Sequence, residues 1–159
     1  MSQAITKEVR SVLIHLHERQ ILLPNAAVAE VMDYQQPEAS VVETPEWFLG
    51  YMVWRGLMIP VVSYEGLLGE PIVTPGHRGR ILILNAPGGF EGVSHIGLVV
   101  HTIPSLVRVS AENVAPVDPA ADETHQPLIL QRVELDLSPA LIPDLDEIER
   151  RVVEIVQAG

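Results

Sequence analysis

Two histidines, His15 and His17, have the spacing in this chain that best suits metal binding. Apolar and polar residues alternate over 9–17, which is strand periodicity, so both imidazoles are expected on one face. Zinc accepts imidazole nitrogens as ligands, and this pair could supply two of them. Spacing identifies no third ligand. The alternative, which the sequence favours, is an edge strand with two polar side chains turned outward.

Carboxylates form the second candidate group. Glu43, Glu46 and Glu65 lie close in sequence to Trp47 and Trp54, and two acids in a concave site could perform acid–base catalysis. The favoured alternative is a solvated rim of acids around a β-hairpin. The chain lacks a nucleotide-binding glycine loop and a Gly-x-Ser-x-Gly elbow. It also has no cysteine, which excludes disulfides, thiol catalysis and cysteine-ligated zinc.

Arg55 is the only basic residue in the apolar segment 44–70. It stands with Gly56 at a predicted tight turn between two strands, so its charge needs a partner or water. One interpretation is a surface ion pair with Glu46 or Glu65, worth less than about 1 kcal/mol. The other is a guanidinium offered to the carboxylates or carbonyls of a partner protein.

Aromatic residues gather around the same turn. Five of the seven aromatic residues fall within eighteen positions, at Trp47, Phe48, Tyr51, Trp54 and Tyr64. Strand alternation places Tyr51 and Val53 on one face and Met52 and Trp54 on the other, so one face is exposed or covered by a partner. Such rings fill a core or form interface hot spots, and both roles are expected here.

Composition limits the partners. The formal net charge is −11 and Lys7 is the only lysine, which argues against nucleic acid and anionic membranes. The acidity favours solubility or a basic protein partner. No apolar run reaches the roughly 20 residues of a membrane helix, and no signal-peptide pattern is present. We therefore expect a cytoplasmic protein without direct membrane insertion.

Short runs rich in Val, Ile and Leu predict an all-β fold within a single domain over 1–159. An arm over 1–8, a junction near 70–79 and an exposed loop over 116–126 are expected from composition. Helical turns are predicted over 45–50, capped by Thr44, and over 64–68. A longer helix over 144–157 has Asp144 as N-cap and Glu147 three residues later. The predicted strands cover 9–17, 21–23, 28–32, 51–54, 57–62, 80–85, 95–100, 106–109, 128–131 and 133–137, with a turn at 138–139.

The pattern TP-x-x-x-x-G-x-x-x-x-RG-x-x-IPVV over 44–62 resembles the signature of CheW-like domains. This family contains adaptors that join chemoreceptors to the histidine kinase CheA. The segment Val28-Ala29-Glu30-Val31 resembles the family segment that contributes to receptor contact, and 96–100 and 107–116 resemble later strands. Ser63, Trp54 and His101 depart from the usual residues.

The resemblance implies two five-stranded SH3-like β-barrels packed about a shared core, with short helical turns and a C-terminal α-helix. It implies a non-enzymatic adaptor without a cofactor. The partners would be the regulatory domain of a CheA-type kinase and the cytoplasmic tip of a methyl-accepting chemoreceptor. The departures favour a divergent member that serves type IV pilus motility. The implied interaction residues are Arg55, Gly56, Gly50, Val53, Val28, Glu30 and Trp54, with a groove near Val28, Glu30 and Gly50.

Two alternatives remain at this stage. One is a small β-barrel metal-dependent enzyme or metal binder that uses His15 and His17. The other is a module that binds an extended peptide by adding it as a strand to an open sheet edge.

Overall fold

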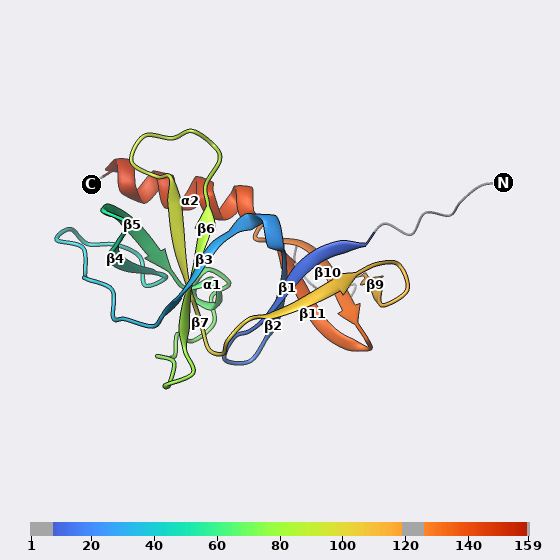
Figure 1. The fold of residues 1–159 in the computed structure, drawn as a ribbon. Helices are drawn as coiled ribbons and strands as arrows, with labels where there is room; N and C mark the ends of the chain where they lie inside the picture. The colour runs from blue at the N-terminus through green and yellow to red at the C-terminus, as the bar shows by residue number, and fades with distance from the viewer. Residues whose placement is uncertain (1–7, 119–125, 159) are drawn as a thin grey trace.

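The computed structural model describes residues 8–118 and 126–158, so most of the predicted arm and most of the loop over 116–126 lie outside the described residues. Within these ranges, eleven strands form two sheets that lie side by side (Figure 1). The first sheet has the order β8-β1-β2-β11-β10-β9. Its strands are β1 (Val9–His15), β2 (Gln20–Pro24), β8 (Ser105–Val109), β9 (Val114–Val117), β10 (Ile129–Leu135) and β11 (Ser138–Pro143).

The second sheet has the order β3-β6-β7-β5-β4. Its strands are β3 (Val28–Asp33), β4 (Phe48–Trp54), β5 (Leu57–Val62), β6 (Arg80–Asn85) and β7 (His95–Val100). The chain after β3 returns to the other edge strand, β4, where Glu38 and Tyr51 exchange two backbone hydrogen bonds of 2.8 Å. This bridge closes the sheet into a barrel.

Both faces of the central strands β6 and β7 are buried, which explains their nearly continuous apolar sequences. In β6, Ile81 and Ile83 point into the barrel interior. Leu82 and Leu84 point the other way, into a larger core shared with β1, β2 and the C-terminal helix. Strand alternation thus lets one strand serve two cores. The shared core makes the two sheets one packed body.

The C-terminal helix α2 (Leu145–Ala158) confirms the predicted helix to within one residue at each end. Asp144 Oδ1 accepts a hydrogen bond from the Glu147 backbone N–H at 3.1 Å, as an N-cap does. Glu147 also pairs with Arg151 at 2.9 Å. The buried residues Ile148 and Val152 anchor the helix to the shared core. Among the described residues, no helix is long and apolar enough to span a bilayer.

The all-β class is confirmed, and the first sheet has one strand more than expected. The predicted strands 128–131 and 133–137 form the single strand β10, and neither β9 nor β11 is among the predicted strands. Strand β9 pairs with β10 although the sequence around Pro116 predicts a loop. The turn between β10 and β11 lies at Asp136 and Leu137, both with positive φ, rather than at 138–139.

The chain passes between the sheets through η1 (Asn25–Ala27) and through 101–104. Residues 70–79 instead connect α1 (Tyr64–Leu67) to β6.

The helix predicted over 45–50 is absent, and β4 already begins at Phe48. Gly50 does not end a helix. It lies in a β-bulge with φ of 135°, where the register to β5 shifts. A Cβ at this position would lie 2.1 Å from the carbonyl oxygen of Glu38. Gly50 therefore allows the barrel-closing strand to approach.

Candidate functional site

The β4–β5 hairpin ends in the two-residue turn Arg55-Gly56. Both residues have positive φ, 48° and 78°, which matches the turn type that suits the twist of a two-residue hairpin. Asn, Asp or Gly usually occupies the first position, because other side chains cost roughly 1–2 kcal/mol in this conformation. An arginine here is a strained choice, and strain of this kind is a reason to look for a function.

Glu30 is the partner of Arg55, instead of Glu46 or Glu65. Its Oε1 accepts hydrogen bonds from Arg55 Nη2 at 2.9 Å and from Trp54 Nε1 at 3.1 Å. Glu30 lies on β3, Trp54 ends β4 and Arg55 lies in the turn after it, so the carboxylate links the two edge strands of this sheet. The pair contributes less than about 1 kcal/mol, because the Arg55 side chain is 67% exposed. Its main effect is to orient the guanidinium.

The Trp54 ring also packs against Arg55. The Arg55 Cζ atom lies 4.8 Å from the centre of the Trp54 ring, which is cation–π geometry. The Trp54 ring also contacts the His95 ring, with ring centres 4.5 Å apart. Trp54 is 5% exposed and belongs to the barrel core. It can therefore act on a partner only by positioning Arg55, rather than by offering its ring.

Apolar side chains surround Arg55 on the surface. Val53 and Met58 face each other across the hairpin and are 61% and 56% exposed. Leu57 follows the turn and is also exposed. We call Val53, Arg55, Leu57 and Met58 the hairpin patch. An arginine fixed among exposed apolar side chains has the composition of an interface hot spot.

The hairpin patch continues into a groove of about 460 Å³ between the hairpin, the segment 38–44 and α2. Met58 and Tyr51 line it on the hairpin side, and Ile155 and Val156 line it on the helix side. Val41 and Val42 add exposed apolar surface at its rim. The sequence did not indicate this groove, since its residues come from three distant segments.

The structure brings together five of the seven predicted interaction residues, namely Glu30, Val53, Trp54, Arg55 and Gly56. Val28 is half-buried against the shared core. Gly50 is buried in the bulge of β4. Neither Val28, Glu30 nor Gly50 lines the groove beside the patch. Val28 and Gly50 therefore shape the barrel near the site and do not form its surface.

The other candidates of the sequence lie apart from the patch. His15 and His17 are exposed, but β1 ends at His15, and the His17 ring contacts His101 with ring centres 5.7 Å apart. Within the described ranges no three His, Asp or Glu side chains are grouped to hold a metal ion. Glu43 and Glu46 are exposed, whereas Glu65 is buried.

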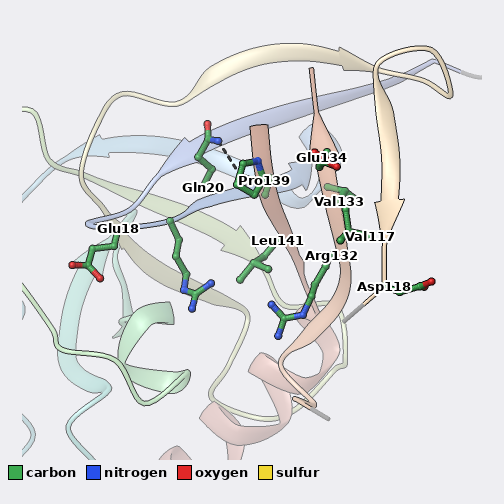
Figure 2. A pocket seen from close by; sticks show the side chains of 11 residues that line it. Glu18, Gln20, Val117, Asp118, Arg132, Val133, Glu134, Pro139 and Leu141 are labelled. Atoms are coloured by element: carbon green, nitrogen blue, oxygen red, sulfur yellow. Dashed lines mark hydrogen bonds between the residues drawn. The ribbon is translucent and has the colours of Figure 1, made fainter. Parts of the chain in front are cut away.

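A further pocket of about 470 Å³ lies on the six-stranded sheet, between the β1–β2 turn and strands β9, β10 and β11 (Figure 2). Gln20 donates a hydrogen bond to the carbonyl of Pro139 at 3.0 Å across it. Its rim carries charges of both signs, and Arg19 is already engaged by Glu70. The pocket therefore presents charges of both signs to a ligand, so it does not select a ligand of one sign.

Comparison with known proteins agrees with this architecture. The model of the CheW-like domain family matches residues 10–152, so the chain belongs to this family. The fold is similar to that of the scaffolding protein TtCheW from Thermoanaerobacter tengcongensis, with a TM-score of 0.72 and 21% sequence identity. The match covers 91% of this chain and 90% of that one. Comparison with the curated proteins gives no match.

Proposed function

We propose that this protein is a non-enzymatic adaptor that couples chemoreceptors to a CheA-type histidine kinase. Its membership of the CheW-like family supports a chemosensory scaffold role. The observation that carries the proposal is the hairpin patch, where Glu30 and Trp54 hold an exposed arginine among apolar side chains. This arrangement suits binding to another protein and provides no chemistry for transforming a substrate.

The patch supports the proposal through pre-organisation. Arg55 is held by a carboxylate and a ring before any partner arrives, so less side-chain freedom is lost on binding. The guanidinium retains donors beyond the one that Glu30 engages, and a partner carboxylate or backbone carbonyl can accept them. The apolar neighbours Val53 and Met58 would exclude water around this contact.

The two partners would use different surfaces of one body. The kinase regulatory domain would pack on one barrel, and the helical tip of the receptor would enter the groove beside Met58. The shared core supports treating both sheets as one domain. Receptor state would then bias how kinase and adaptor pack, with a coupling of about 1–3 kcal/mol. Many small contacts in an array would add avidity.

Reversing the charge of Arg55 tests this proposal. We expect Arg55→Glu to weaken binding of the cognate kinase domain or receptor by at least about 1–2 kcal/mol, the loss typical of a hot spot. The new carboxylate would also face Glu30. Titration calorimetry with each purified partner measures the change, and circular dichroism checks the fold.

Arg10→Glu is the matched control, because Arg10 is an exposed arginine on β1 in the other sheet. It changes the net charge equally, so a long-range electrostatic effect would appear in both variants. Equal affinities for wild type and Arg55→Glu, with the fold unchanged, would remove Arg55 from the interface.

We further propose that the protein serves a chemosensory cluster that controls pilus-based motility. The support is the set of departures from the usual family residues at Trp54, Ser63 and His101. The Trp54 ring packs against Arg55, and Ser63 and His101 line one pocket. Deletion of the gene should abolish directed twitching and leave swimming intact. Loss of swimming alone would assign the protein to a flagellar pathway.

A further inference from the structure

A pocket of about 220 Å³ lies away from the hairpin patch, where the segments 34–39 and 72–75 meet the end of β7. One part of its wall is apolar and includes Leu49, Ile72, Val73 and Val99, and Tyr34 adds a phenol ring. Its polar end holds Glu65 and His101. Of the described residues, no lysine or arginine lines it.

Glu65 is an acid in an unusual position, since only 4% of it is exposed. It lies on α1, which Ser63 caps by accepting a hydrogen bond from the Gly66 N–H at 3.0 Å. Its Oε2 accepts the backbone N–H of His17 at 3.0 Å. A carboxylate has about four acceptor positions, so acceptor capacity remains.

The nearest side chain is His101, whose Nε2 lies 3.6 Å from Glu65 Oε1. This separation exceeds hydrogen-bonding distance, so the two groups face each other without a shared hydrogen bond. Burial, and then the charge of His17, lowers the pKa of His101, which keeps its ring uncharged near neutral pH. Burial also raises the pKa of Glu65, and the backbone N–H and the charge of His17 oppose this rise only in part.

We propose that this pocket binds a primary ammonium group on a short alkyl chain. The ammonium carries three N–H donors, which can reach Glu65 Oε1 and the uncharged Nε2 of His101 together. The alkyl chain would contact Ile72, Val73 and Val99, and the Tyr34 ring offers a face that attracts cations. The ligand supplies the positive charge that the pocket lacks.

Titration of the whole protein with n-butylammonium chloride, at constant ionic strength, tests the proposal. We expect saturable NMR shifts of the His101 ring and of the backbone amides of 72–75. The neutral ligand n-butanol has the same chain length and should bind at least about tenfold more weakly, because it lacks the charged hydrogen bonds. This comparison needs no variant, so it stands even if a substitution disturbs folding.

Glu65→Gln should weaken n-butylammonium binding at least about tenfold, since the amide keeps the shape and loses the charge. Glu46→Gln is the matched control at an exposed site outside the pocket and should leave binding unchanged.

An acetylated and amidated Gly-Lys-Gly peptide identifies the source of the ammonium group. Binding of the peptide assigns the pocket to a lysine of a partner, and binding of the free amine alone assigns it to a small metabolite. Absence of saturable shifts with n-butylammonium, or equal binding of n-butanol, overturns the proposal.

Discussion

Trp54→Ala should destabilise the protein by about 3–5 kcal/mol, the range measured for removing a large buried aromatic side chain. The ring is 5% exposed and packs in the barrel core with Met52 and Ile59. The substitution also removes the donor to Glu30 and the face beneath Arg55. For a chain of this size the melting temperature should fall by on the order of 10 °C.

Trp54→Phe separates the two contributions of the side chain. It keeps one aromatic ring in the core, and it loses the second ring of the indole together with the N–H that donates to Glu30. It should therefore cost less than Trp54→Ala, with about 1 kcal/mol of its cost coming from the lost hydrogen bond. Thermal and urea denaturation of both variants measure these differences. A melting temperature that Trp54→Ala leaves unmoved would contradict the burial of this ring.

Gly50→Ala should destabilise by roughly 2–4 kcal/mol, because two penalties coincide at this position. The backbone has φ of 135°, which L side chains rarely adopt. A Cβ would also lie 2.1 Å from the carbonyl oxygen of Glu38, whose backbone closes the barrel against Tyr51. Urea denaturation at equilibrium gives the loss directly.

Gly69→Ala is the control for Gly50→Ala. Gly69 has φ of 83°, and a Cβ there would meet nothing within 4 Å, so only the backbone penalty applies. Its cost should be about 1 kcal/mol. Equal losses for the two variants would mean that the chain around Glu38 relaxes freely, and the bridge would then have little part in closing the barrel.

The elements that the sequence predicts correctly are those specified by local patterns. Strands β6 and β7 have the predicted bounds, because Val-, Ile- and Leu-rich runs end at turn residues on both sides. The helix α2 follows from Asp144 and the helical spacing of apolar residues. The hairpin turn at Arg55-Gly56 is also local, and the exposed face of β4 follows from alternation.

The features that sequence reasoning missed depend on contacts between distant segments. Pro45 and Gly50 have the residue types of a short helix, yet the returning strand at Glu38 imposes a bulge on Gly50. Glu30 is 25 residues from Arg55, and the barrel brings them together because the segment after β3 returns to β4 and pairs with it at Tyr51. The buried Glu65 looks like a surface acid in sequence, and only the packing of α1 against the β1–β2 turn reveals its position.

Co-sedimentation tests whether this protein joins receptor to kinase. The kinase is spun down with receptor-bearing membranes from the cell that produces this protein. If the protein is an adaptor, we expect that adding it carries the kinase into the pellet in a saturable manner. We also expect Arg55→Glu to reduce the amount of pelleted kinase. If the pelleted kinase stays constant while the added protein remains in the supernatant, the protein does not join receptor to kinase, and its assignment as an adaptor is wrong.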